Sequence, residues 1–281
     1  MNQPKVSVIV ATKNEERNIG VCLKSLMEQS YKNIEIIVVD NGSSDRTCQI
    51  AGRYARVYVL NKKNKVKNFR GAQVNLGVKK SKGGIIFFPD ADMTFDKDLI
   101  KEAVVELNHF DALFVPEIVV GNGFFGKVRN FERSFYNETC IDGVRFTRKS
   151  AFKAIGGFDV KNITFGPDDW DFTKSLKKAG FKLGITKKPL FHHEEWMTFS
   201  NYLEKKKKYV GTFDGYINKW GLYDADIKKQ FSPFYRLFCV FFEDGKFLRI
   251  LRHPFLTIGL YYSRLMVALN YFLNKKSFKH G

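Results

Sequence analysis

Residues 34–47 read IEIIVVDNGSSDRT, and this stretch decides the fold. Its first six residues are almost all apolar and rich in β-branched side chains, which predicts a parallel strand covered on both faces. Residues 6–11, VSVIVA, form a second run of the same kind. Between the two runs, apolar residues recur at helical spacing and predict a helix over residues 16–27, namely Ile19, Leu23, Leu26 and Met27. The stretch therefore closes a strand, helix, strand unit.

The polar end of the same stretch predicts a second crossover. Residues 41–45, NGSSD, are typical of a turn and lead through a short helix to a strand over residues 57–60. A further apolar run, residues 85–88, places Asp90 at the carboxyl edge of the sheet, where open α/β sheets bind their ligands. The pattern predicts an α/β fold of the nucleotide-binding type, with a mostly parallel central sheet and helices on both faces.

The rest of the chain is less regular. A helix is expected over residues 168–178, and a Lys- and Tyr-rich helix over residues 199–220. Residues 121–140 mix Gly, Phe and basic residues without periodicity, and we interpret them as a substrate-facing insertion. We therefore expect an α/β domain over residues 1–220 and a helical, basic and aromatic tail over residues 221–281.

The composition and net charge of the chain limit the kinds of molecule that it is expected to bind. The chain has 281 residues, 44% of them apolar, which is enough to bury a substantial core and excludes a mainly disordered chain. The formal charge is +18, and residues 205–281 carry 15 Lys or Arg against 5 Asp or Glu. Such a surface attracts polyanions, but no nucleic-acid-binding signature accompanies it, so we expect no nucleic acid partner.

The cysteines and the N-terminal segment indicate the cellular compartment. The four cysteines are far apart and indicate neither a metal knuckle nor a compact disulfide framework. The N-terminus runs directly into a strand-like segment without the pattern of a cleaved signal. We expect a reducing, cytoplasmic location.

Several motifs occur in the order typical of one family. The chain resembles the family 2 type glycosyltransferases of the GT-A fold over about residues 5–220. The segments that carry the resemblance are SVIVATKNEE, IIVVDNGSSDRT, RGAQVNLGVKKSKGGIIFFPDADM, FKAIGGFD, GPDDWDF and HHEE. Any one of them is weak evidence, but six in sequence are hard to obtain by chance.

The resemblance implies that the first strand and its loop hold a nucleotide. Thr12 and Glu15 would lie near the nucleoside, and Asp40 would contact the base. An acid after a parallel strand is well placed to accept hydrogen bonds from a ribose or a base. The alternative is that Asp40 bonds only within its own turn, as Asp often does.

The resemblance also implies a divalent cation. Asp90 and Asp92 match the DXD motif of the family, in which Mn²⁺ or Mg²⁺ bridges the donor diphosphate. Hard oxygen ligands suit both cations, although Asp-x-Asp at a strand end is also common in turns and helix caps. The family often places a histidine after a late strand as a further ligand. We favour His192 over His193, because neighbours on a strand face opposite sides.

Asp168 and Asp169 match the acidic motif of the family. Asp169 is implied to be the general base that takes a proton from the acceptor hydroxyl, in a single displacement that inverts the anomeric carbon. Both acids also suit the start of a helix, so one carboxylate can stabilise the helix while its neighbour catalyses.

Two departures from the family pattern refine the expectation. Val74 stands where relatives commonly carry Arg, which leaves Arg70 or Lys67 to contact a diphosphate. The Gln-x-x-Arg-Trp signature of processive relatives is absent near residues 205–209, which favours addition of one sugar. Acceptor contacts are expected within residues 121–147, with Asp142 and Arg145 as candidates for that role.

The tail suggests a membrane surface. Residues 255–272, FLTIGLYYSRLMVALNYF, are too short for an ordinary transmembrane span and contain an arginine. Basic residues flank this segment, namely Arg249, Arg252, His253, Lys275 and Lys276. An interfacial helix on anionic lipid fits this composition, and a helix packed on protein is the alternative.

Together these observations predict an inverting, metal-dependent, non-processive glycosyltransferase. It would move one sugar from a UDP- or GDP-sugar to an acceptor hydroxyl, on a glycan or polyprenyl-linked acceptor, at the inner face of the cell membrane. The alternatives are a polyprenyl-phosphate sugar synthase and a catalytically silent scaffold that binds a sugar nucleotide or membrane.

Overall fold

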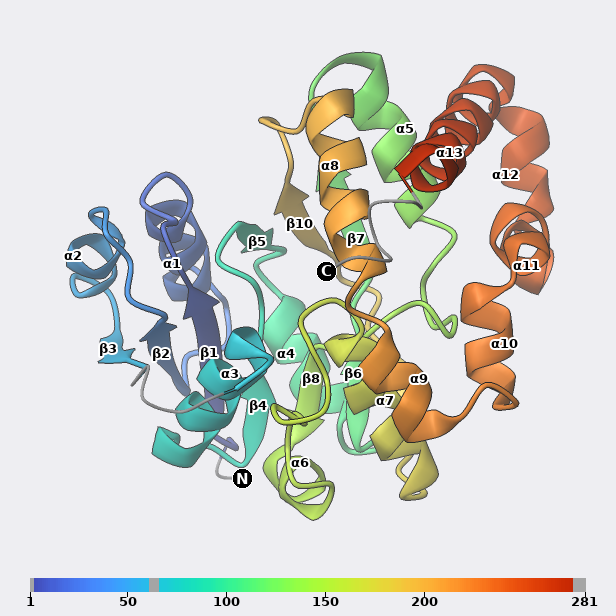
Figure 1. Ribbon diagram of the computed structural model, residues 1–281. Helices are drawn as coiled ribbons and strands as arrows, with labels where there is room; N and C mark the ends of the chain where they lie inside the picture. Colours follow the sequence, from blue (N-terminus) through green and yellow to red (C-terminus); the bar gives the residue numbers. More distant parts are fainter. Residues whose placement is uncertain (1–2, 61–65, 275–281) are drawn as a thin grey trace. The chain divides into compact units, whose positions relative to one another are not determined.

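A computed structural model describes residues 3–60 and 66–274, shown in Figure 1. The chain forms two compact units. The first comprises the residues up to Glu117 together with Asp142–His192. The second comprises Ile118–Ile141 and the residues from His193 onward. The domain boundary predicted near residue 220 stays a prediction. In the structure, residues 193–220 belong to the same compact unit as the later helices.

The first unit is built on a seven-stranded sheet in the order β3-β2-β1-β4-β8-β6-β9. The strands are β1 (Val6–Thr12), β2 (Ile34–Asp40), β3 (Arg56–Val59), β4 (Ile85–Phe87), β6 (Ala112–Phe114), β8 (Phe146–Arg148) and β9 (Leu183–Ile185). Strands β3, β2, β1 and β4 run parallel to one another, and β8 runs antiparallel to both β4 and β6. The predicted mostly parallel sheet is confirmed.

Helices cover both faces of this sheet, as predicted. They are α1 (Ile19–Met27), α2 (Thr47–Ala51), α3 (Phe69–Lys80), α4 (Leu99–Glu106), α6 (Lys149–Ala154) and α7 (Asp168–Lys178). Side chains of β1 alternate between two buried cores because successive residues of a strand face opposite sides. Val8 and Val10 share a core with α1, α2 and α4, whereas Ile9 shares the other core with α3, α6 and α7.

Helix α3 packs very close to β1, and Gly77 permits this. A Cβ atom at Gly77 would lie 2.2 Å from Ile9 Cγ2, which is far inside van der Waals contact. The close approach brings the first turn of α3 to the carboxyl end of β1, where the polar residues of the sheet edge lie.

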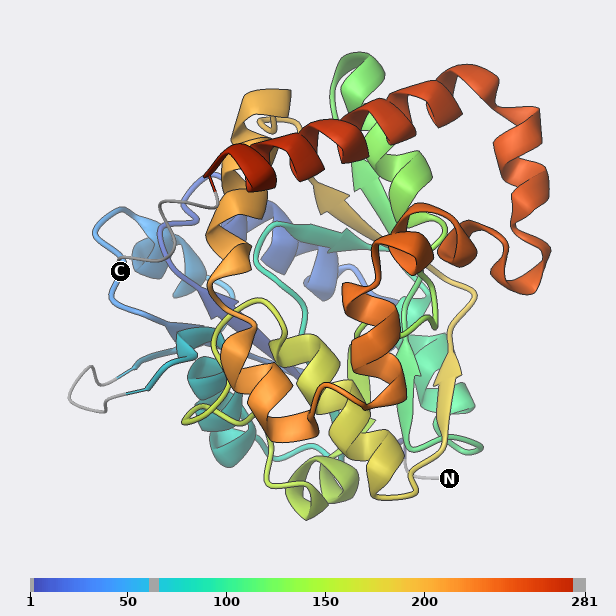
Figure 2. The ribbon, with the colours of Figure 1, turned by 45° about the vertical axis from the view of Figure 1, so that its right-hand side comes forward.

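The second unit is helical. Its helices are α5 (Gly123–Arg133), α8 (Phe199–Val210), α9 (Asp214–Trp220), α10 (Ala225–Phe231), α11 (Pro233–Leu237), α12 (Phe247–Arg252) and α13 (Pro254–Asn274), with 3₁₀ turns at Cys239–Phe241 and Glu243–Gly245. Helix α13 packs against both α5 and α8, as Figure 2 shows. In the parts of the chain that the structure describes, no helix has the length and apolar character needed to cross a bilayer.

Two of the changes from one unit to the other along the sequence fall within strands of a small three-stranded sheet. Its strands are β5 (Met93–Phe95), β7 (Glu117–Val120) and β10 (Leu190–His193), in the order β5-β10-β7. The antiparallel pairing of β10 with β5 sets Met93 opposite His192.

Three expectations about the elements were wrong. Residues 121–140 contain the regular helix α5, with Val128, Phe131 and Glu132 buried on one face. The helix expected over residues 199–220 is interrupted after α8 and resumes as α9. The first helix begins at Ile19 and not at residue 16, because Glu15 to Asn18 form a turn in which both Asn18 and Ile19 donate to Glu15 O. Lys275 and Lys276 of the tail lie outside the described residues.

Candidate active site

Three strands of the first unit end side by side and present polar residues at one edge of the sheet. Thr12 lies opposite Asp40 in the parallel register of β1 and β2. Ala11 forms a parallel bridge with Asp90, just beyond the end of β4. This is the carboxyl edge of the sheet, where α/β proteins bind their ligands.

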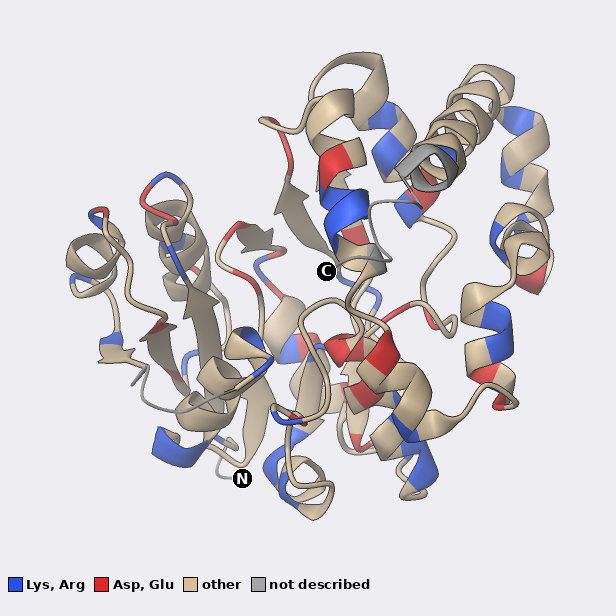
Figure 3. Ribbon diagram, viewed as in Figure 1, with Lys and Arg blue, Asp and Glu red and all other residues tan. Residues whose placement is uncertain are grey.

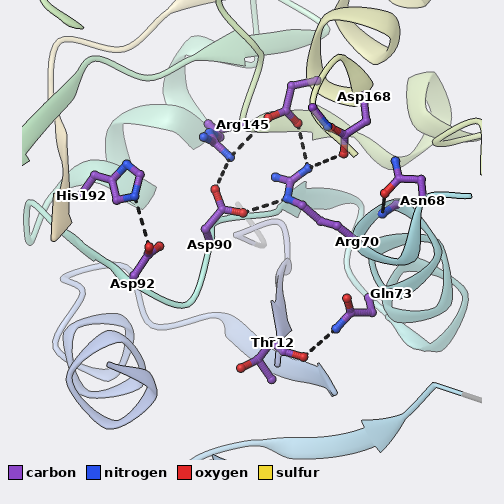
Figure 4. Close-up of polar contacts among 12 residues, drawn as sticks. Thr12, Asn68, Arg70, Gln73, Asp90, Asp92, Arg145, Asp168 and His192 are labelled. Atoms are coloured by element: carbon purple, nitrogen blue, oxygen red, sulfur yellow. Dashed lines mark hydrogen bonds and ion pairs between the residues drawn. The ribbon is translucent and has the colours of Figure 1, made fainter. Parts of the chain in front are cut away.

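Two buried oxygen atoms at this edge lack hydrogen-bond partners among the described residues. They are Thr12 Oγ1 and Asn41 Oδ1, on residues that are 3% and 7% exposed. Gln73 of α3 holds the backbone around them, since its Nε2 donates to Thr12 O at 2.9 Å (Figure 4) and to Val39 O at 2.6 Å. Buried polar atoms without partners are rare, and here they fit a ligand that carries hydroxyl or N–H groups.

Asp40 and Glu15 form local contacts near these atoms. The Asp40 carboxylate accepts hydrogen bonds from Ser43, from its backbone N–H at 2.7 Å and from its hydroxyl. This is the turn alternative, and contact of Asp40 with a base stays a prediction. Glu15 accepts from Asn18 Nδ2 at 2.8 Å, and burial with nearby carboxylates, Asp92 foremost, raises the pKa of Glu15.

Arg70 gathers three carboxylates around one guanidinium, as Figure 4 shows for Asp90 and Asp168. Its Nε lies 2.9 Å from Asp90 Oδ1. Its Nη1 lies 3.2 Å from Asp168 Oδ2 and 2.9 Å from Asp169 Oδ1. The residue occupies the first turn of α3, which begins at the cap Asn68, whose side chain accepts from Gly71 N at 2.8 Å. Arg70 therefore joins the end of β4 to the start of α7.

Arg145 contacts the same cluster from another direction. Its Nη1 lies 3.0 Å from Asp90 Oδ2 and 4.0 Å from Asp169 Oδ2. The backbone holds it there, because Phe88 N donates to Arg145 O and Arg145 N donates to Leu113 O. Two guanidinium groups thus face three carboxylates, of which Asp168 is the most deeply buried.

The electrostatics of this cluster follow from burial and charge pairing. Burial raises the pKa of Asp90, but Arg70 and Arg145 outweigh it and hold that pKa well below its usual range. Asp168 is 3% exposed, and burial together with the charge of Asp169 raises its pKa. One carboxylate of the acidic pair is thus desolvated, whereas the side chain of Asp169 is 26% exposed.

Asp168 and Asp169 occupy the first turn of α7, and their contacts differ. Asp168 Oδ1 accepts from Gly166 N at 3.0 Å and so helps to hold the start of the helix. Asp169 packs against Gly143, where an added Cβ would lie 2.7 Å from Asp169 Cβ. Asp169 is therefore the more accessible member of the pair.

Asp92, His192 and Glu117 form a second polar group, of which Figure 4 shows Asp92 and His192. His192 Nε2 lies 3.2 Å from Asp92 Oδ2, and His192 Nδ1 lies 2.9 Å from Glu117 Oε1. Burial lowers the pKa of His192, but the hydrogen bonds with Asp92 and Glu117 outweigh it and raise that pKa to about 10. Arg145 Nη2 lies 3.8 Å from Glu117 Oε2 and connects this group to the first cluster.

This second group fits a divalent cation in part. A carboxylate on one imidazole nitrogen orients the ring and makes the other nitrogen a better ligand, an arrangement common at metal sites. Asp92 and His192 supply one oxygen and one nitrogen donor. Among residues 3–60 and 66–274 no group of three or more acidic, histidine or cysteine side chains could hold a metal alone. The remaining ligands would have to come from a substrate.

The structure separates some predicted residues from this site. Lys67 is exposed, and its backbone N–H donates to Val160 O at 2.9 Å. His193 Nδ1 lies 2.9 Å from Glu195 Oε1, whereas His192 lies beside Asp92. Asp142 is 3% exposed and accepts from Gly143 N at 3.0 Å, so little of its surface can contact an acceptor.

Sequence reasoning missed four contributors, namely Asn41, Gln73, Glu117 and the pairing of Arg145 with Asp90. Glu117 and Arg145 are brought to the site by strands distant in sequence, so no local sequence motif identifies them as site residues. Asn41 directly follows Asp40 at a predicted strand end and could have been included on that signal.

Comparisons with solved structures identify the fold. A mannosyltransferase from Pyrobaculum calidifontis, PcManGT, solved with GDP-Man and Mn²⁺, superposes with a TM-score of 0.57. It is 19% identical, and the match covers 99% of this chain and 87% of that one. S. aureus TarS 1–349 in complex with UDP-GlcNAc gives a TM-score of 0.53 at 20% identity, covering 99% of this chain and 92% of that one. These likenesses establish a GT-A fold.

Residues 7–164 match Glycosyl transferase family 2, and they make up more than half of the chain. The chain therefore belongs to glycosyl transferase family 2. Glycosyltransferase AglE of Haloferax volcanii is 27% identical over 248 residues, covering 82% of this chain and 78% of that protein. Beta-monoglucosyldiacylglycerol synthase of Synechocystis sp. is 25% identical over 240 residues, which span 77% of this chain and half of the synthase.

Proposed function

We propose that the protein transfers a single sugar from a UDP- or GDP-sugar to an acceptor hydroxyl, with inversion at the anomeric carbon. The observation that carries the proposal is the sheet edge itself. It combines unpartnered polar atoms, a guanidinium and carboxylate cluster, and the group of Asp92, His192 and Glu117. Family membership supports the reaction class.

The donor nucleotide would bind along the ends of β1 and β2. Thr12 Oγ1 and Asn41 Oδ1 are buried without partners and can bond the hydroxyl or N–H groups of a nucleoside. The negative diphosphate would lie toward Arg70 and Arg145, whose planar guanidinium groups suit phosphate oxygens. Lys67, although predicted for this contact, is the more exposed candidate.

Asp92 and His192 would hold Mn²⁺ or Mg²⁺, and Glu117 would orient the imidazole. The predicted ligand role of Asp90 competes with its ion pairs to Arg70 and Arg145. A bound cation supplies positive charge that stabilises the departing diphosphate. The guanidinium groups supply further charge of the same kind, already in place before the reaction.

Asp169 would act as the general base. The acceptor oxygen forms a bond to the anomeric carbon while the bond from that carbon to the diphosphate oxygen breaks. The acceptor proton passes to Asp169, and the electron pair leaves with the nucleoside diphosphate. Asp169 meets the requirement of access because its side chain is 26% exposed, whereas that of Asp168 is 4% exposed.

The acceptor would be carried by a membrane, and the protein would act at the inner membrane face. Helix α13 exposes an apolar stripe at helical spacing, formed by Phe255, Ile258, Tyr262, Leu265 and Leu269. Exposed apolar patches of this kind indicate interaction sites. The neighbouring α12 carries exposed Arg249 and Arg252, which favour an anionic surface.

A polyprenyl-phosphate sugar synthase is the second candidate. It shares the donor site and differs only in the acceptor, and the same exposed stripe favours it.

Release of nucleoside diphosphate from a panel of UDP- and GDP-sugars, with and without Mn²⁺, tests the proposal. We expect metal-dependent release from one donor in the wild type, and its loss in Asp92→Asn and Asp169→Asn. Donor binding without release under any condition, membrane lipids included, would instead support a silent scaffold.

A further inference from the structure

A cavity of about 300 Å³ lies within the second unit, among helices α5, α8, α11 and α13. Its charged lining is mostly basic and includes Lys206, Lys207, Arg236 and Arg264. Leu237 and Ala268 contribute apolar surface. Figure 2 shows the long helix α13 running beside α8 and α5. None of these side chains belongs to the candidate active site.

The one carboxylate in the lining is already neutralised. Glu132 lies 2.7 Å from Arg129 Nη1 and 3.1 Å from Arg264 Nη2, and it accepts from the Tyr136 hydroxyl at 2.7 Å. Burial raises the pKa of Glu132, but Arg264 and Arg129 outweigh it and hold that pKa well below its usual range. Lys206 and Arg236 therefore leave the cavity with an excess of positive charge.

Arg264 has a buried donor that the described residues do not satisfy, and Lys206 lies beside it in the cavity. The Arg264 side chain is 9% exposed, and its Nε is buried without a hydrogen-bond partner among the described residues. Lys206 Nζ lies 5.2 Å from the centre of the Tyr202 ring, and Glu132 is the carboxylate that acts on its charge. Burial lowers the pKa of Lys206 to about 7. A buried guanidinium donor without a partner is costly, and an anion in the cavity that accepts from it would relieve that cost.

An apolar groove of about 570 Å³ adjoins the cavity. It shares Arg264, Leu237 and Ala268 with the cavity, so the two spaces meet at these side chains. Its other walls include Ile258 and Leu265, which belong to the exposed stripe of α13. The groove therefore opens where the proposed membrane contact lies, and Figure 3 shows basic residues along the neighbouring helices α8, α10 and α12.

We infer that this cavity and groove bind one anionic phospholipid, with the phosphate among Lys206, Arg236 and Arg264 and an acyl chain in the groove. The charge of the cavity matches a phosphate, and guanidinium groups bind phosphate oxygens well. The apolar groove matches hydrocarbon and would not favour a free ion. This inference deepens the membrane contact proposed above and does not depend on sugar transfer.

Calorimetric titration of the full chain with dihexanoyl phosphatidic acid, a soluble monomeric lipid, tests the inference without a charged bilayer. Lys206→Gln removes a cavity cation, whereas Lys208→Gln removes the same charge from an exposed position on the same helix outside both spaces. Ala268→Leu fills the junction without changing charge. We expect Lys206→Gln and Ala268→Leu to weaken binding by at least about 10-fold, and Lys208→Gln to leave it unchanged.

Three outcomes would overturn the inference. They are no binding by the wild type, equal weakening in Lys206→Gln and Lys208→Gln, and binding of inorganic phosphate as tight as that of the lipid. Thermal unfolding of each variant shows whether it is folded, and Ala268→Leu provides a test that keeps every charged group. Asp169→Asn should bind the lipid as the wild type does, so loss of transfer and loss of lipid binding are separate results.

Discussion

Glu117→Gln separates the positioning of His192 from the transfer chemistry. In the structure, Glu117 Oε1 lies 2.9 Å from His192 Nδ1, and the other ring nitrogen lies 3.2 Å from Asp92 Oδ2. Glutamine keeps the size of the side chain but removes the charge that orients the ring and makes Nε2 a stronger donor. Arg145 retains its 3.0 Å contact with Asp90, so the neighbouring cluster keeps its main ion pair.

Loss of such a supporting carboxylate typically weakens metal affinity by about 10- to 100-fold. This corresponds to about 1.4 to 2.7 kcal/mol of binding free energy. Calorimetric titration with Mn²⁺ in the presence of the nucleoside diphosphate measures the effect directly. Turnover of Glu117→Gln should recover at saturating Mn²⁺, because the reacting groups are unchanged.

Glu28→Gln is the matched control, since Glu28 is an exposed residue at the end of α1 and forms an exposed ion pair with Lys24 at 3.9 Å. It should bind Mn²⁺ as the wild type does. Unchanged Mn²⁺ affinity in Glu117→Gln would refute the assignment of His192 as an oriented ligand. So would a lower turnover that excess Mn²⁺ does not restore.

Three further changes test other parts of the structure. Asp169→Asn should lower turnover by about 10²- to 10⁴-fold while calorimetry shows unchanged donor binding, as expected for loss of a general base. Gly143→Ala should lower turnover more than donor affinity in steady-state kinetics, because the added Cβ would lie 2.7 Å from Asp169 Cβ and displace that side chain. Lys206→Met should raise the free energy of unfolding near neutral pH, since it removes a partly buried cation. Burial lowers the pKa of Lys206 in the folded chain to about 7, against its ordinary value of 10.5, so the unfolded chain binds the extra proton between these values. Wild-type stability should therefore rise across that window by up to about 1.4 kcal/mol per pH unit from this group, and denaturant titrations of the variant should lack that rise.

The parallel core of the fold was predictable from local patterns. Apolar β-branched runs identified β1 and β2, because strands covered on both faces need few polar residues. Helix α7 was predicted over the residues it occupies, since acids begin it and Gly180 follows it. The placement of Asp40 and Asp90 at one edge follows from the parallel direction of the strands that precede them.

The contacts within the site were less predictable, because they depend on strands brought together over long distances in sequence. Arg145 reaches Asp90 through the pairing of β8 with β4, 55 residues away in sequence, and Glu117 meets His192 across 75 residues. Helix α5 was missed because its Gly and Phe residues obscure a periodicity that becomes clear only once Glu132 is seen to be buried among arginines. In the sequence alone Glu132 interrupts the apolar pattern, because its burial becomes visible only in the structure.

The binding of UDP and GDP, each titrated with and without Mn²⁺, tests the central claim most directly, because it needs neither the donor sugar nor the acceptor. The proposed site predicts that the wild type binds one of the two nucleotides in a Mn²⁺-dependent manner, and that Asp92→Asn loses this dependence. Binding of neither nucleotide, or equal Mn²⁺-dependent binding by Asp92→Asn, would contradict the placement of the donor site at the carboxyl edge of the sheet.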